Sequence, residues 1–249
     1  MPELQEDAWK WVGLGPPGGL QQSSGRLLIP GYHSLVWPAP NESSIGSGFT
    51  KGHTLVSDDQ GKSWRIASRR FGDPYFTNED QAAELRNGTL VVGSRVFRDQ
   101  RAWSWSDDGG ETFPRVRLSP EVHETYQGCE GSLVNIPRST MAGETVDRLL
   151  YSGVQGRLPL RLYRENLTIF ESLDAGLSWS LLGVVNEGSS AYSAMVDLSD
   201  TNDDAKQSLG ILYERSTCTH ETCPVIFLPQ FISWQVLDLS ELEEARRSI

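Results

Sequence analysis

The chain has 249 residues and a net charge of −11, and 38% of its residues are hydrophobic, including 8 Trp, 8 Phe and 7 Tyr. This is enough apolar material for one substantial core or two small domains. The acidic balance, without a stripe of Lys and Arg, argues against a nucleic-acid-binding protein. No apolar run approaches the roughly 20 residues that span a bilayer.

The first residues, MPELQEDAWKWVG (1–13), are acidic and lack the apolar stretch of about 7–15 residues that marks a signal peptide. After them, short segments rich in Val, Ile, Leu and aromatic residues alternate with Gly, Pro, Asn, Asp and Ser, as in β-strands joined by turns. In chain order, the clearest expected strands are GRLLIPGYHSL (25–35), GTLVVGSRVF (88–97), DRLLYSGV (147–154), NLTIFESL (166–173), SLGILYER (208–215) and VIFLPQFISWQVLDL (225–239).

The connections support an all-β chain. Asn87-Gly88 predicts a hairpin with a two-residue type I′ turn, because both central positions of that turn take positive φ. Only LSELEEARRSI (239–249) has a helix-forming composition. We therefore expect one all-β domain over residues 1–249, with residues 240–249 as a short C-terminal tail.

An octapeptide occurs three times between the expected strands, as SDDQGKSW (57–64), SDDGGETF (106–113) and SLDAGLSW (172–179). Its aspartate can accept hydrogen bonds from N–H groups of a turn, its glycine permits positive φ, and its last aromatic residue can pack between sheets. We interpret it as a structural hairpin motif rather than a catalytic one. The loose repeat, roughly 50 to 65 residues apart, fits four-stranded propeller blades with insertions.

The cysteines give no metal site. There are three, Cys129, Cys218 and Cys223, and the odd number without a CxxC pair argues against zinc. Cys218 and Cys223, in CTHETC, either close a small disulfide loop or stay reduced, and the sequence leaves both open. His220 between them is interpreted as a turn residue.

The octapeptide is the Asp-box of sialidases, although it also occurs in propellers of unrelated function. The chain resembles sialidases (neuraminidases), particularly bacterial and lysosomal-type animal enzymes, from about Trp9 to Leu239, and further segments carry this resemblance. They are GLGPPGGLQQSSGRLLIPGYH (13–33), NEDQAAELRNGTLVVGSR (78–95), and RENLTIFESLDAGLSW (164–179) followed by SSAYSAMVDL (189–198). The last combines an arginine, an Asp-box and a tyrosine in order, which makes it the most specific.

The resemblance implies a six-bladed β-propeller, of which this chain holds about four blades. It also implies an exo-α-sialidase that removes terminal α-linked sialic acid, with retention, from glycoproteins, oligosaccharides or gangliosides, without a metal or cofactor. The alternatives are a non-catalytic, lectin-like sialoside-binding protein and a propeller for protein interaction.

By the resemblance, Arg95 and Arg164 are two members of the arginine triad that binds the substrate carboxylate. A planar guanidinium suits this role because it donates paired, charge-assisted hydrogen bonds. Both arginines lie at ends of expected strands, and the neighbouring rivals for the role are Arg98, Arg101 and Arg161.

The resemblance makes Tyr192 the nucleophile, Glu79 the base that activates it, and Glu214 a carboxylate that orients the triad. A phenol is suited to attack beside the carboxylate of sialic acid, which repels an anionic nucleophile, and sialidases with a tyrosine nucleophile are an exception among glycosidases. Asp80 and Glu84 are acidic neighbours of Glu79. Core positions are the default expectation for the other strand tyrosines, Tyr32, Tyr75 and Tyr213.

Two expected features have no match here: the Arg-Ile-Pro-like strand with the first triad arginine, and the aspartate that acts as acid and base. Asp7 lies in the wrong context for that aspartate. We therefore expect the chain to lack roughly the first two blades of its family and to be a partial sequence, with an inactive fragment as the alternative to an active enzyme. Three glycosylation sequons, at Asn41, Asn87 and Asn166, favour a lysosomal, membrane-associated or secreted protein over a cytoplasmic one.

Overall fold

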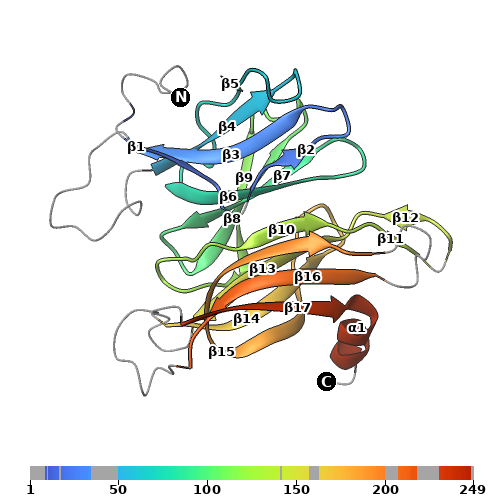
Figure 1. The fold of residues 1–249 in the computed structure, drawn as a ribbon. Coiled ribbons are helices and arrows are strands. Elements are labelled where there is room, and N and C mark those ends of the chain that lie inside the picture. The colour runs from blue at the N-terminus through green and yellow to red at the C-terminus, as the bar shows by residue number, and fades with distance from the viewer. Residues whose placement is uncertain are drawn as a thin grey trace, which may run out of the picture. The chain divides into compact units, whose positions relative to one another are not determined.

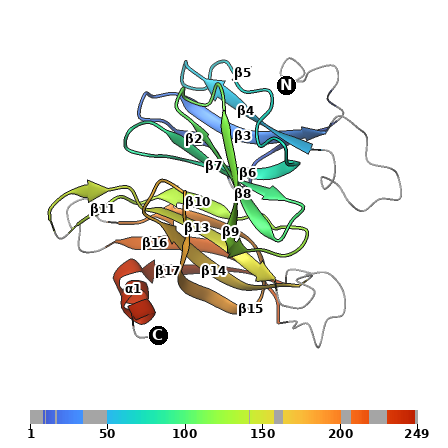
Figure 2. The same ribbon diagram turned by 180° about the vertical axis from the view of Figure 1, so that it is seen from behind.

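The computed structural model describes residues 9, 11–16, 18–34, 50–140, 142–156, 163–199, 207–217 and 230–247. The chain divides into two compact units, Met1–Ser119 and Pro120–Ile249 (Figures 1 and 2). Each unit is described by itself, and the single domain expected from the sequence stays a prediction. No helix within the described residues is long and apolar enough to cross a membrane.

The first unit is built from two β-sheets. One has the order β1-β3-β4-β5, with β2 paired to β3, and the other has the order β6-β7-β8-β9. The strands are β1 (Trp11–Leu14), β2 (Leu20–Gln21), β3 (Leu27–Ser34), β4 (Thr50–Ser57), β5 (Arg65–Ile66), β6 (Thr77–Glu84), β7 (Leu90–Val96), β8 (Gln100–Ser106) and β9 (Arg115–His123), which continues past Ser119 into the second unit.

The second unit holds a six-stranded sheet with the order β10-β13-β14-β15-β16-β17 and a small β11-β12 pair. The elements are β10 (Ser132–Asn135), β11 (Arg138–Ser139), β12 (Thr145–Val146), β13 (Leu149–Gly156), β14 (Arg164–Ser172), β15 (Ser180–Asp197), β16 (Ser208–Arg215), β17 (Phe231–Asp238) and the helix α1 (Leu239–Arg247). The long strand β15 pairs with β14 through its first half and with β16 through its second (Figure 1).

The core of the second unit comes from alternating strand positions, as expected where only one face of a strand is buried. Its fully buried apolar residues include Leu150, Leu167, Ile169, Leu182, Leu209 and Ile211. The helix α1 adds the buried Leu239 to this cluster. A β-carbon at Gly183 would lie 2.8 Å from a methyl carbon of Leu242, so glycine leaves room for α1 against β15.

The first Asp-box has the hydrogen bonds of a structural turn. Asp59 accepts the Ser57 hydroxyl and the Ser63 amide, both at 2.8 Å, and the Ser63 hydroxyl at 2.6 Å. The Gly61 amide donates to the Ser57 hydroxyl at 2.8 Å, and the Trp64 indole donates to the Gly61 carbonyl at 3.2 Å. The Ser63 hydrogen bonds, with that of Ser57, lower the pKa of Asp59 to about 2.

The other two boxes repeat the hydrogen bonds to the carboxylate, around Asp108 and Asp174. The glycine at the fifth position of each box, Gly61, Gly110 or Gly176, has a φ between 83° and 89°. A residue with a side chain would be strained in this conformation. The three aspartate carboxylates thus accept hydrogen bonds from donors within their own turns. This supports the interpretation of the octapeptide as a structural motif.

The Asn87-Gly88 hairpin forms, but its predicted turn type is wrong. Leu85 and Thr89 close the loop with a 2.8 Å bond from the Leu85 amide to the Thr89 carbonyl, so three residues lie between them. Gly88 has a φ of 87°, whereas Asn87 is not in the positive region. A three-residue loop needs only one left-handed residue, and here the glycine takes that role.

Two buried histidines make the first unit sensitive to acid. The rings of His33 and His53 lie with their Nδ1 atoms 3.2 Å apart, and the indole of Trp9 stacks on His33. Burial lowers the pKa of His33 to about 4 and that of His53 to about 3, with smaller contributions from the charges of Arg70 on His33 and of His33 on His53.

We expect the free energy of unfolding to fall as the pH drops below about 6.5. In that range the two histidines bind protons in the unfolded chain but stay neutral in the folded one. The loss is on the order of 1–2 kcal/mol per histidine between pH 6.5 and 5. Urea denaturation at both pH values measures it, and His53→Gln should remove about half of the histidine contribution. An identical pH dependence in that variant would contradict this account.

Candidate functional site

In the first unit, the structure brings Glu79 and Arg95 together. They lie on the neighbouring strands β6 and β7, where the register shifts between Asn78 and Gln81. Glu79 takes a φ of 45°, a left-handed conformation that is uncommon for a residue with a side chain. Its Oε2 lies 2.6 Å from Nη1 of Arg95, and the two side chains are only 9% and 13% exposed. Backbone strain at a bulge beside a charged pair is a feature of functional sites.

The neighbouring charged residues Asp80 and Arg101 are more deeply buried than Glu79 and Arg95. Asp80 is fully buried, and burial raises its pKa to about 7, an effect that the charge of Arg101 partly offsets. Arg101 is also fully buried and donates to the carbonyls of Glu79, at 3.3 Å, and of Gly93, at 3.2 Å. Arg101 therefore supports the strand that carries Glu79.

Sequence reasoning placed Tyr32 in the core, but the structure sets it beside this charged pair. Burial raises the pKa of the Tyr32 phenol, the charges of Glu79 and Asp80 raise it further, and the charge of Arg95 lowers it. Tyr32 is half-buried on β3 and packs against Trp11. It lies 47 residues from Glu79 in the sequence, and no local pattern relates the two.

In the second unit, the structure brings Arg164, Tyr192 and Glu214 together. Arg164 is the first residue of β14, and its guanidinium carbon lies 5.8 Å from the centre of the Tyr192 ring. Tyr192 is partly buried against the core of its unit. Glu214, on β16, accepts the backbone amide of Tyr192 at 3.2 Å through its Oε2.

A second carboxylate, which sequence reasoning missed, lies on the next amide. Glu130 is 1% exposed, and its Oε2 accepts the Ser193 amide at 2.8 Å. Glu130 and Ser193 are 63 residues apart, so the sequence shows no spacing that pairs them. The two peptide groups that flank Tyr192 are thus each bound by a glutamate.

The alternative residues have other partners. Arg98 is exposed, and its guanidinium carbon lies 5.7 Å from the centre of the Tyr75 ring. Glu84 accepts the Ser23 amide at 2.7 Å and the Ser23 hydroxyl at 3.0 Å. Arg161, Asp7, Asn41 and the pair Cys218–Cys223 lie outside the described residues.

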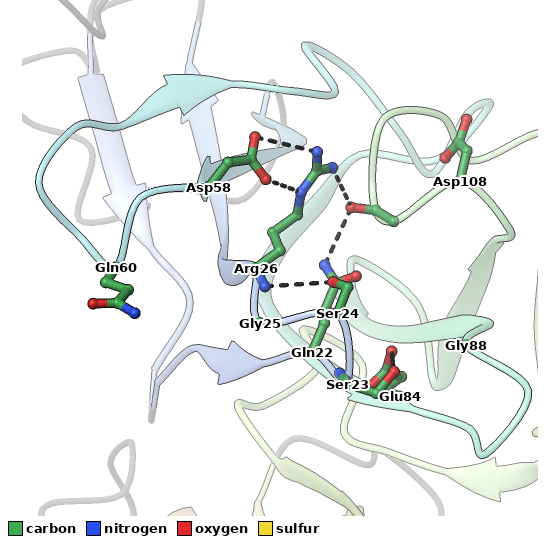
Figure 3. Close-up of a pocket in the computed structure, with 11 residues that line it drawn as sticks. Gln22, Ser23, Ser24, Gly25, Arg26, Asp58, Gln60, Glu84, Gly88 and Asp108 are labelled. Carbon is green, nitrogen blue, oxygen red and sulfur yellow. Dashed lines mark hydrogen bonds and ion pairs between the residues drawn. The ribbon is translucent and has the colours of Figure 1, made fainter.

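One cavity of about 570 Å³ lies in the first unit, but none of the predicted site residues lines it. Figure 3 shows Arg26 in this cavity, with its guanidinium held by Asp58 through bonds of 2.6 and 3.2 Å. Arg26 also bonds Glu111 at 2.9 Å. These charges bind one another, so the cavity is formed by a network that joins the Asp-box turns.

The comparisons with known proteins agree with these observations. Residues 3–204 match the model of the BNR repeat-like domain. Mouse sialidase-3 is 36% identical over 135 residues, which cover 51% of this chain and 31% of the mouse protein. The sialidase of Bacteroides fragilis (strain YCH46) is 27% identical over 240 residues, which cover 92% of this chain and 38% of that protein.

A similar solved structure is a mutant of the NanB sialidase from Streptococcus pneumoniae. The TM-score is 0.68 at 23% identity, over 92% of this chain and 31% of that one. This likeness shows the fold, and it confirms the predicted all-β class of the sialidase propeller type. The chain spans about a third of the length of the curated relatives it matches. The chain belongs to the sialidase family and carries the BNR repeat-like domain.

Proposed function

We propose that the chain acts in an exo-α-sialidase and supplies its nucleophile, its activating base and two of its carboxylate-binding arginines. The observation that carries the proposal is the placement of Tyr192, whose ring lies beside the Arg164 guanidinium and whose two flanking peptides are bound by Glu214 and Glu130. A core tyrosine needs no such arrangement. The names of the relatives support sialic acid as the substrate.

The proposed mechanism begins with the substrate carboxylate, which Arg95 and Arg164 bind through charge-assisted hydrogen bonds. Glu79 accepts the phenolic proton of Tyr192, and the phenolate oxygen attacks the anomeric carbon while the bond to the leaving oxygen breaks. A water molecule then attacks the anomeric carbon from the face opposite the tyrosyl bond. As the tyrosyl bond breaks, Glu79 returns its proton to the phenolate oxygen, and the proton that the water loses passes to the group that protonated the leaving oxygen. Sialic acid is released with retained configuration.

We propose that Glu79 and Arg95 act on the same substrate molecule as Arg164 and Tyr192. Within the first unit, the 2.6 Å pair of Glu79 and Arg95 supports the proposed role of Glu79. The ion pair fixes the position of the Glu79 carboxylate. The leaving oxygen also needs a proton donor, and we assign that role to none of the residues above.

Replacing either arginine by alanine is expected to weaken binding of sialyllactose roughly 10- to 100-fold, because each removes charge-assisted hydrogen bonds to the carboxylate. Isothermal titration of the wild type, Arg95→Ala and Arg164→Ala measures this. Arg98→Ala is the matched control, since Arg98 is exposed and lies over Tyr75. Equal affinity in all four proteins would exclude the proposed carboxylate site.

Turnover separates the proposed enzyme from the alternatives. Release of fluorophore from a fluorogenic α-sialoside supports a sialidase. Binding that is lost in Arg164→Ala, without any turnover, indicates a lectin-like protein. No binding at all indicates a propeller for protein interaction.

A further inference from the structure

The backbone at Tyr192 lies where β15 changes its pairing partner. Up to Ser189 the strand pairs with β14, and from Ser190 onward it pairs with β16. The register with β16 shifts between Ser190 and Ser193, so Tyr192 lies inside a bulge. Amides at such a place lose ladder partners and need others.

Two carboxylates from different elements bind these amides. Glu214 reaches the Tyr192 amide from β16, at 3.2 Å. Glu130 reaches the Ser193 amide from the loop before β10, at 2.8 Å. The first bond fixes the peptide group before the Cα of Tyr192 and the second fixes the one after it. Together they define φ and ψ of Tyr192, and thus the direction in which its side chain leaves the backbone.

The loop that carries Glu130 is itself held closely. A β-carbon at Gly131 would lie 2.2 Å from the Ser152 carbonyl oxygen, so the loop lies directly against β13. The hydroxyls of Ser152 and Ser193 are 2.8 Å apart, and Ser132 accepts the Met195 amide at 3.0 Å. Contacts with β10 and β13 therefore fix the position of Glu130, and Glu130 in turn holds β15 through the Ser193 amide.

We propose that Glu130 is a positioning residue for Tyr192, which acts by fixing the Tyr192–Ser193 peptide so that the phenol stays beside Arg164. This proposal rests on the proposed nucleophilic role of Tyr192. It adds a residue that touches neither the substrate nor the reacting atoms.

Glu124 offers a matched control for Glu130. It is also 1% exposed and lies in the same unit, but it accepts the hydroxyl of the core residue Tyr151. Glu130→Ala removes the acceptor of the Ser193 amide, and Glu130→Gln restores an acceptor oxygen without the charge. Glu124→Ala removes a carboxylate of similar burial whose hydrogen bond goes to Tyr151 on β13.

Amide hydrogen exchange, followed by NMR on the folded chain, tests the positioning without any need for turnover. We expect the Ser193 amide to exchange at least about tenfold faster in Glu130→Ala, near the wild-type rate in Glu130→Gln, and unchanged in Glu124→Ala. The ring resonances of Tyr192 should shift in Glu130→Ala only. Unchanged Ser193 exchange in Glu130→Ala, or equal acceleration in Glu124→Ala, would overturn the proposal.

If the wild type cleaves the fluorogenic sialoside, steady-state kinetics test the effect of Glu130 on turnover. In Glu130→Ala, kcat should fall roughly 10- to 100-fold with KM within about twofold, since a displaced nucleophile affects the reaction more than binding. Glu130→Gln should recover most of kcat. Wild-type kcat in Glu130→Ala would overturn the proposal, whereas a wild type without turnover would overturn the proposed function and leave the exchange result to decide the role of Glu130.

Discussion

Replacing Tyr192 by phenylalanine is expected to lower the release of fluorophore from an α-sialoside roughly a thousandfold or more. The substitution removes one oxygen atom and keeps the ring, so the contact with Arg164 and the packing against the core are retained. The loss thus reports the missing nucleophile. Steady-state kinetics with the purified chain measures it.

Tyr213→Phe is the control for this substitution. Tyr213 lies on β16, beside the bulge that holds Tyr192, and its side chain is buried in the core of the same unit. It should keep nearly full activity. Equal turnover by Tyr192→Phe and the wild type would show that this phenol is not the nucleophile.

Replacing Arg148 by methionine is expected to destabilise the second unit by about 3–5 kcal/mol, because it removes one partner of a buried ion cluster. The Arg148 side chain is 1% exposed. Its Nη1 lies 2.6 Å from Glu243 of α1 and 3.8 Å from Glu171 of β14, and its Nη2 donates to Gln207 at 2.6 Å. The substitution leaves Glu171 buried beside fewer cations and removes one of the contacts that hold α1 on the sheet.

Thermal unfolding measures this effect, with an expected fall in Tm of roughly 10 °C. Arg247→Met is the control, because Arg247 lies 3.5 Å from the same Glu243 but is 74% exposed. It should change the stability by no more than about 0.5 kcal/mol. Similar Tm values for the two variants would contradict a structural role for the buried cluster.

The sequence predicted features whose causes are local. The strands at 88–97 and 208–215 were recognisable because apolar residues and turn residues alternate over a few positions, and β7 and β16 form there. The Asp-box was interpretable for the same reason, since all its hydrogen bonds lie within a few residues. The tail at 239–249 has helix-forming residues, and α1 forms at Leu239–Arg247.

The parts that could not be predicted depend on contacts distant in the sequence. The acceptor of the Ser193 amide is 63 residues away, and nothing near Glu130 distinguishes it from a surface glutamate. Arg148 resembles an ordinary charged residue before a strand until α1 brings Glu243 to it. The turn at Gly88 failed for a different reason, because the same dipeptide fits both two-residue and three-residue loops.

The candidate site contains both residues that the sequence predicted and residues that only the structure reveals. Family resemblance in short segments proposed Glu79, Arg95, Arg164, Tyr192 and Glu214, and the structure pairs them within each unit. The residues that hold them in place, Arg101 under Glu79 and Glu130 beside Tyr192, are visible only in three dimensions.

The central claim is that the Arg95 and Arg164 guanidinium groups and the Tyr192 phenol surround one sialic acid. A crystal structure of the chain with an unsaturated sialic acid analogue tests it most directly. We predict both guanidinium groups at about 2.7–2.9 Å from the ligand carboxylate, and the phenolic oxygen at about 3–3.5 Å from the anomeric carbon. A ligand bound away from Tyr192, or the two arginines on separate surfaces, would contradict the account.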